Sequence, residues 1–136
     1  MEVPGEAAGI MRLAYKVWLD QGGKVFGEGP CELLGRVDDT KSLRQAALQM
    51  GMSYSKAWSL MRRLEKKIGF QVLRRKVGGR AGGGSELTPA GRLLMERYKD
   101  FSADVREAVA RIYSEHFGSF EREVRRVTKE VAARQR

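Results

Sequence analysis

Cysteine and histidine are nearly absent from this chain of 136 residues, which contains one of each, Cys31 and His116. A single cysteine excludes a disulfide within the chain, and one cysteine with one histidine cannot provide the four ligands of a zinc finger. The same scarcity leaves no nucleophile, base and orienting residue for catalysis, so we expect neither an enzyme nor a cofactor. We interpret Cys31 as a small core residue and His116 as a surface residue.

Long apolar runs are missing as well. No stretch of the sequence approaches the length of a membrane-spanning helix, and the acidic start MEVPGEAAG, interrupted by proline and glycine, does not resemble a signal peptide. We therefore expect a cytoplasmic protein without a membrane partner. Hydrophobic residues still make up 42% of the chain, which is enough for a domain of this length to form a core without disulfides or metal ions.

Acidic residues are fewer than basic ones, because 17 Asp and Glu stand against 26 Lys and Arg and give a net charge of +9. The excess is local: residues 31–88 contain twelve basic and five acidic side chains and therefore carry +7 of that charge. Such a region is typical of a protein that binds a polyanion, most often nucleic acid. Basic residues also keep protein surfaces soluble, and charge alone does not distinguish the two explanations.

The N-terminal part of the sequence predicts a β-hairpin after a flexible segment of residues 1–12. Residues 13–19 place apolar side chains on alternate positions, with the period of two that is typical of a strand. Residues 21–23 contain two glycines and predict a turn, and residues 24–26 predict a short returning strand.

Three helices are predicted next. The first begins at Gly29-Pro30, because proline at the first helical position loses no useful N–H, and ends near residues 38–39 with three residues facing inward, Leu33, Leu34 and Val37. The second begins at Ser42, which is followed three residues later by Gln45 in the spacing of a capping box.

The second helix ends at Met50, and Gly51 can take the positive φ that often closes a helix. Ser53 then caps a third helix that runs to about Ile68, where Gly69 ends it; apolar residues recur along it at helical spacing, namely Ala57, Leu60, Met61, Leu64 and Ile68. A short helix, a turn with glycine and a longer capped helix are typical of a helix-turn-helix.

Residues 71–88 predict a second β-hairpin. A strand over 71–76 leads into the glycine-rich basic tip of residues 77–84, and residues 85–88 return as a strand. A plain linker would not be flanked by the basic run RRK and a β-like segment. A phosphate-binding loop needs a lysine after its glycines, which this segment lacks. We therefore interpret the hairpin as the wing of a winged helix.

The remaining residues, 89–136, predict helices. Thr88 and Pro89 have the residue types of a helix cap and first helical position, and Gly118 divides the segment in two. Apolar residues follow a heptad-like spacing of four and three, which we expect to pair two copies of the chain; packing on the same domain is the alternative. These residues are Leu94, Tyr98, Phe101, Val105, Ala108, Ile112, Phe120, Val124, Val127 and Val131.

The expected fold is therefore mainly α with small β elements (α+β). It has a winged helix-turn-helix domain over residues 13–88, opened by the N-terminal hairpin, and a helical dimerisation region over residues 89–136.

Residues 42–97 resemble the N-terminal DNA-binding domain of ModE-type molybdate-responsive transcription regulators and, more loosely, the winged helix of the LysR type. The similarity rests on the AA…MGMSY…AW turn, the RLEKKIG…VLRRK run, the GG…GGGS tip and the LTPAG helix start, and extends over residues 13 to about 100. ModE-type regulators usually continue into β-barrel domains that bind oxyanions, whereas residues 100–136 lack an alternating strand pattern. The resemblance thus implies molybdate-related regulation without a molybdate-binding domain in this sequence.

The helix-turn-helix reading and the resemblance together predict a homodimer bound to double-stranded DNA. The third helix, about 53–68, enters the major groove, and the wing over 71–88 contacts the backbone or the minor groove. Trp58 is expected to pack against the neighbouring helix instead of contacting DNA. The predicted DNA-binding residues are Ser42, Arg44, Ser53, Tyr54, Ser55, Lys56, Ser59, Arg62, Arg63, Arg74, Arg75, Lys76 and Arg80.

A second hypothesis stays open: the chain is an adaptor that binds DNA or protein and depends on a separate partner chain that senses the effector. Winged helices that bind only proteins tend to lose the basic helix that faces the groove, whereas this sequence keeps it. RNA binding is disfavoured, because the sequence shows no aromatic stacking platform or RNP-like strand.

Overall fold

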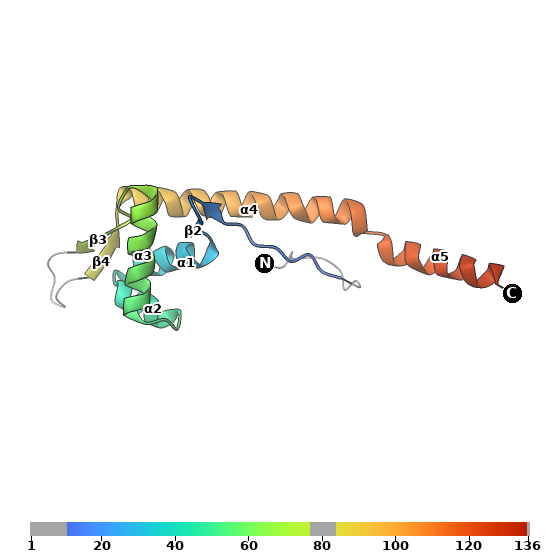
Figure 1. Ribbon diagram of the computed structural model, residues 1–136, viewed down its shortest axis with the longest axis horizontal. Helices are drawn as coiled ribbons and strands as arrows, with labels where there is room; N and C mark the ends of the chain where they lie inside the picture. Colours follow the sequence, from blue (N-terminus) through green and yellow to red (C-terminus); the bar gives the residue numbers. More distant parts are fainter. Residues whose placement is uncertain (1–10, 77–83, 136) are drawn as a thin grey trace. The chain divides into compact units, whose positions relative to one another are not determined.

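The computed structural model describes residues 11–76 and 84–135, which form two small β-hairpins and five helices (Figure 1). The predicted α+β winged helix-turn-helix fold is confirmed. The elements in chain order are β1 (Leu19–Asp20), β2 (Lys24–Phe26), α1 (Glu28–Thr40), α2 (Leu43–Gln49), α3 (Tyr54–Ile68), β3 (Leu73–Lys76), β4 (Gly84–Leu87), α4 (Pro89–Phe117) and α5 (Phe120–Arg134).

The chain divides into two compact units. One comprises Val17–Phe101, and the other, within the described residues, combines residues 11–16 with residues 102–135. The helix α4 therefore belongs to both units, with its first 13 residues in the first one. Residues 89–101 of α4 thus belong to the same unit as the helix-turn-helix and the wing.

The N-terminal hairpin is shorter than predicted. Only Leu19–Asp20 pairs with Lys24–Phe26, whereas the sequence predicted a strand over residues 13–19. The predicted alternation is nevertheless present, since residues 13, 15 and 17 are half-buried and residues 14, 16 and 18 are exposed. The strand β2 has only three residues, so most of residues 13–19 have no neighbouring strand with which to form hydrogen bonds. The prediction of a full strand is therefore wrong.

The predicted helix starts at Ser42 and Ser53 are confirmed by their caps. The Ser42 hydroxyl accepts a hydrogen bond from the Gln45 N–H at 3.1 Å, and the Ser53 hydroxyl accepts one from the Lys56 N–H at 3.1 Å. Each cap pairs a donor that the first turn of a helix leaves unpaired. The reciprocal half of the capping box differs, because the Ser42 N–H donates to the Thr40 hydroxyl.

The core of the Val17–Phe101 unit is formed by the apolar faces of α1, α2 and α3 with residues from β2, the wing and the start of α4. The buried residues are Val25, Phe26, Cys31, Leu33, Leu34, Val37, Leu43, Ala46, Ala47, Ala57, Met61, Leu64, Val72, Leu87, Met95 and Tyr98. Small buried alanines on α2 and α3, namely Ala46, Ala47 and Ala57, let these helices approach closely. Cys31 is buried and His116 is exposed, as predicted.

Tyr98 is a core residue and not a member of the predicted dimer seam. Its ring packs edge-on against Phe26 with centroids 5.3 Å apart, and its hydroxyl donates to the Val17 carbonyl at 2.9 Å. Leu94 also packs partly against this core. The prediction from heptad spacing is wrong for Tyr98. A helix that packs on its own domain shows nearly the same apolar periodicity as one in a dimer seam, and the first turns of α4 pack in this way.

The wing is held to the helices by close backbone contacts. Strands β3 and β4 pair antiparallel in the register Leu73↔Leu87 to Lys76↔Gly84. The Ser85 N–H donates to the Lys41 carbonyl at 2.9 Å, and the Thr88 N–H donates to the Val72 carbonyl at 3.0 Å. These bonds fix the base of the wing beside α1 and the start of α4.

Aromatic rings mark the junction between α4 and α5 in the second unit. Tyr113 stacks on Phe117 at 5.3 Å between centroids, and Phe117 contacts Phe120 at 5.4 Å across Gly118. None of the 15 residues of α5 is buried within the described part of the chain. Its apolar residues therefore remain open to solvent.

Candidate nucleic-acid interface

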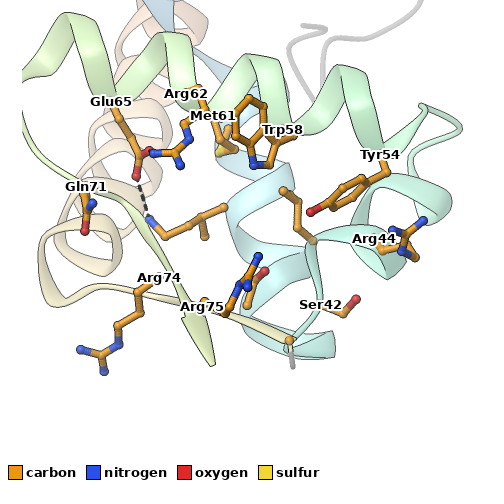
Figure 2. A pocket seen from close by; sticks show the side chains of 14 residues that line it. Ser42, Arg44, Tyr54, Trp58, Met61, Arg62, Glu65, Gln71, Arg74 and Arg75 are labelled. Carbon is orange, nitrogen blue, oxygen red and sulfur yellow. Dashed lines mark hydrogen bonds and ion pairs between the residues drawn. The ribbon is translucent and has the colours of Figure 1, made fainter. Parts of the chain in front are cut away.

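A groove of about 660 Å³ lies between α3, the start of α2 and the wing (Figure 2). We call it the α3–wing groove. All of its lining residues belong to the Val17–Phe101 unit. They are Ser42, Leu43, Arg44, Tyr54, Trp58, Met61, Arg62, Glu65, Gln71, Leu73, Arg74, Arg75, Gly84 and Ser85.

The groove is basic. Four arginines line it, and Glu65 is the one acidic residue among its lining side chains. Glu65 also stabilises the fold, because its carboxylate accepts hydrogen bonds from the Val72 N–H at 2.8 Å and the Leu73 N–H at 3.3 Å. Glu65 also forms an ion pair with Arg62 at 3.8 Å, and Arg74 forms one with Glu86 at 2.8 Å. With four arginines and one glutamate in its lining, the groove still carries a net positive charge, as a surface that binds a phosphate backbone does.

Two arginines lie on aromatic rings. The Arg44 guanidinium is 4.4 Å from the centroid of the Tyr54 ring, and the Arg62 guanidinium is 4.8 Å from that of Trp58. Cation–π contacts of this kind restrict the guanidinium orientation while its N–H groups still point outward. The groove thus holds two arginines in fixed positions before any ligand binds.

The prediction that Trp58 packs against the neighbouring helix is wrong. Trp58 is 45% exposed and projects from α3 into the groove (Figure 2). The residue lies one turn after Tyr54 and one turn before Arg62, on the edge of the apolar stripe of α3. That position between two predicted DNA-binding residues was the signal in the sequence for its role, but aromatic residues are more often buried.

The two adjacent arginines of β3 differ in their surroundings. Arg74 pairs with Glu86 across the wing at 2.8 Å, whereas Arg75 points into the groove (Figure 2). No ion pair of Arg75 is found among residues 11–76 and 84–135. Arg75 is therefore the better placed of the two to bind a phosphate.

The structure gathers six of the predicted DNA-binding residues in the α3–wing groove and leaves six others outside its lining. Those in the groove are Ser42, Arg44, Tyr54, Arg62, Arg74 and Arg75. Those outside it, all exposed, are Ser53, Ser55, Lys56, Ser59, Arg63 and Lys76. The hydroxyls of Ser42 and Ser53 already serve as helix caps. Arg80 lies outside the described residues.

Three of the residues outside the groove form the outer face of α3. Ser55, Ser59 and Arg63 follow one another at intervals of four residues, and all three are exposed. Residues spaced by four lie on one side of a helix. The helix thus presents a polar outer face beside the aromatic and basic face that lines the groove.

An ion-pair cluster joins α1 to the start of α4. The Asp38 carboxylate of α1 accepts two hydrogen bonds from the Arg92 guanidinium of α4, at 2.6 and 3.0 Å, and one from Lys41 at 3.2 Å. The hydrogen bonds from Arg92 are the main reason that the pKa of Asp38 falls to about 2. The same pairing raises the pKa of Arg92.

Within residues 11–76 and 84–135, no group of three or more His, Cys, Asp or Glu side chains is arranged to hold a metal ion. None of the helices in this part of the chain is both long and apolar enough to cross a membrane.

Residues 31–92 match the family model of the bacterial regulatory helix-turn-helix proteins of the lysR family. Among curated proteins, the chain is similar to the molybdenum-pterin-binding protein MopB of Rhodobacter capsulatus, with 35% identity over 69% of this chain and 35% of that protein. It is also similar to the molybdenum transport protein ModE of Azotobacter vinelandii, with 27% identity over 66% of this chain and 33% of that protein.

The fold has relatives among solved structures. The CbnR DNA-binding domain in its complex with DNA matches with a TM-score of 0.52 and 20% identity, over 65% of this chain and 95% of that domain. At this identity the match concerns the fold. The chain spans about a third of the length of the two curated relatives.

Fold and groove together define a winged helix-turn-helix domain of the DNA-binding class. Within that class, residues 31–92 form a helix-turn-helix domain of the lysR type, and about two thirds of the chain is similar to the molybdenum-related MopB and ModE. The resemblance seen in residues 42–97 is thereby confirmed. The matched helix-turn-helix domain and the fold are those of DNA-binding regulators.

Proposed function

We propose that this chain acts as a homodimer that recognises a specific double-stranded DNA sequence and regulates transcription. The observation that carries the proposal is the α3–wing groove, in which α3, the start of α2 and the wing bring four arginines together. A duplex against this surface would place phosphates near the groove arginines and base edges near α3. A regulator of this kind would act in the cytoplasm.

Recognition is divided between the two faces of α3. The outer face, with Ser55, Ser59 and Arg63 exposed, would enter the major groove, where hydroxyls and guanidinium groups hydrogen-bond to base edges. The arginines of the α3–wing groove would bind the phosphates that border it and set the register of α3 on the duplex.

The homodimer is supported by exposed apolar residues. Phe101 and Ile112 on α4 are 47% and 50% exposed, and Val127 and Val131 on α5 are 48% and 53% exposed. On α5 the apolar residues Phe120, Val124, Val127 and Val131 recur every four and three residues on one face. A 15-residue helix without buried residues is marginally stable alone, so this face needs a partner.

The regulated genes are proposed to be molybdenum-related, which rests on the similarity to MopB and ModE. The adaptor hypothesis also remains, because the exposed face of α5 fits a separate effector-sensing chain as well as a second copy. The oligomeric state in solution distinguishes the two, since a homodimer needs no other protein.

The proposal is tested by selecting bound duplexes from a random DNA pool at physiological salt, with and without molybdate. We expect enrichment of an inverted repeat whose half-sites are centred about 10 base pairs apart, as a dimer of such domains requires. Binding without any enriched sequence, weakening only as salt rises, would leave a non-specific DNA-binding protein. Enrichment that changes with molybdate would show that this chain senses the oxyanion.

A further inference from the structure

We propose that Trp58 is a specificity-determining residue that contacts a thymine 5-methyl group, so that each half-site has a required T·A pair. This inference rests on the proposed function and deepens it. Arginines that bind phosphates cannot distinguish one base pair from another. The inference therefore assigns a base preference to the aromatic residues of the α3–wing groove.

The first observation is that the groove exposes two large rings side by side. Trp58 is 45% exposed and Tyr54, four residues earlier on α3, is 40% exposed. Residues at this spacing are neighbours on one side of a helix. Exposed apolar area in a hollow lined by charged residues marks a contact surface more often than a solvated one.

The second observation is that each ring already carries a cation. The guanidinium of Arg62 lies 4.8 Å from the centroid of the Trp58 ring, and that of Arg44 lies 4.4 Å from the Tyr54 centroid. A guanidinium stacked in this way occupies a ring face. The surface of Trp58 that remains accessible therefore suits a small apolar group better than a flat base stacked on the ring.

Duplex DNA offers one such group in the major groove, the 5-methyl of thymine, which makes apolar contacts with protein side chains. The bases themselves are stacked in a duplex, so stacking on Trp58 would require one base to leave the helix. Methyl contact requires no such change. The arginine beside the ring can then bind the flanking phosphate.

The test uses the duplex enriched by the selection described above. Each of its thymines is replaced in turn by uracil, which removes the methyl group and keeps the base pair. We expect a loss of affinity of about fourfold at one position of each half-site, which corresponds to about 0.8 kcal/mol for one buried methyl-sized group. Replacement at the other positions changes the affinity little.

Variants identify the residue that makes the contact. In Trp58→Ala the native and uracil duplexes bind equally at that position, while Trp58→Phe retains part of the difference. Trp18→Ala is the matched control, because Trp18 is also an exposed tryptophan with a cation over its ring, Lys24 at 5.5 Å, but does not line the groove. It keeps the full uracil penalty.

Circular dichroism and thermal unfolding confirm that each variant is folded. Tight binding of a selected duplex with no uracil penalty, or with a penalty that persists in Trp58→Ala, would overturn the inference and leave the proposed function intact. A folded native chain that binds no duplex would overturn the proposed function itself. Capture of single-stranded DNA in preference to the duplex would assign the rings to base stacking instead.

Discussion

Arg74 and Arg75 are neighbours in β3 and differ in how much each can contribute to the binding of a DNA phosphate. Arg74 is held by Glu86 at 2.8 Å, whereas Arg75 points into the groove. A charge that is already paired gains less from a phosphate than one that faces solvent. The two residues thus form a natural comparison within one strand.

We predict that Arg75→Ala weakens binding to all duplexes by about 1 kcal/mol, roughly fivefold, and lowers the slope of log affinity against log salt by about 1. Arg74→Ala should have a smaller effect on both quantities. Fluorescence anisotropy at several salt concentrations measures them. Equal effects of the two variants would show that the Glu86 ion pair does not distinguish the arginines.

Asp38 predicts a pH dependence of stability. Its pKa is about 2 in the folded chain because Arg92 donates to its carboxylate, and its ordinary value is 3.8. The unfolded chain therefore takes up this proton more readily, so the contribution of Asp38 is present above pH 4 and is lost as the pH falls towards 2.

Asp38→Asn should consequently lower the free energy of unfolding by about 1 kcal/mol at pH 7, a modest value because solvent screens the partly exposed pair. The difference from the native chain should shrink towards pH 2. Urea unfolding at the two pH values tests this. A difference that is the same at both would mean that the carboxylate charge is not what stabilises the contact between α1 and α4.

Individual residues show where sequence reasoning succeeds and where it does not. The caps Ser42 and Ser53 were predictable because their hydrogen bonds are local, three residues along the chain. Tyr98 and Trp58 were misplaced because their surroundings depend on segments distant in sequence. Tyr98 meets Phe26 and Val17, and Trp58 faces the wing across a groove that exists only in the folded domain.

At the scale of elements, the start of α4 packs against the segment before β3 at Gly91. A Cβ added to Gly91 would overlap the Val72 carbonyl oxygen and lie 2.8 Å from the Val72 Cα. These are backbone atoms, so they cannot move aside as a flexible side chain does. Glycine is therefore required for the junction between the wing and α4.

We predict that Gly91→Ala lowers the free energy of unfolding by about 2 kcal/mol, although alanine favours helix formation. Gly35→Ala in α1 is the matched control, because its Cβ would make only ordinary contacts, with the Lys99 Nζ at 3.8 Å and the Met95 Sδ at 3.9 Å. That variant should be neutral or slightly more stable. Thermal unfolding of both proteins measures the contrast, and equal stabilities would contradict the close approach at Gly91.

The accuracy of the element predictions followed the range of the interactions. The helices α2 and α3 were predictable with their ends because caps, glycines and apolar periodicity agree within each segment. The strand over residues 13–19 was overestimated, since its alternation is real but a strand also needs a partner, and β2 offers three residues. Pairing length is a property of two segments together.

At the scale of the whole molecule, the proposed dimer depends on the apolar face of α5. We predict that Val127→Lys raises the dissociation constant of the dimer at least tenfold, because a lysine in the seam would lose contacts and bury a charge. Ala133→Lys is the control: it adds the same charge on the opposite side of α5. Sedimentation equilibrium gives the mass of each protein.

A native chain that is monomeric, or a Val127→Lys variant that remains dimeric, would contradict pairing through this face. The first result would favour the adaptor hypothesis, in which a separate chain covers α5. Heptad spacing alone did not separate these cases, because it places Leu94 and Tyr98 in the same row as the residues of α5, whereas the structure buries Tyr98 in the core and packs Leu94 against it.

The most direct test of the DNA-binding geometry is chemical protection of the selected duplex by the native chain. Guanine N7 lies in the major groove and adenine N3 in the minor groove, so methylation by dimethyl sulfate reports on both. With α3 in the major groove, guanine N7 should be protected in two half-sites about 10 base pairs apart. A bound duplex whose guanines remain fully reactive would contradict the entry of α3 into the major groove.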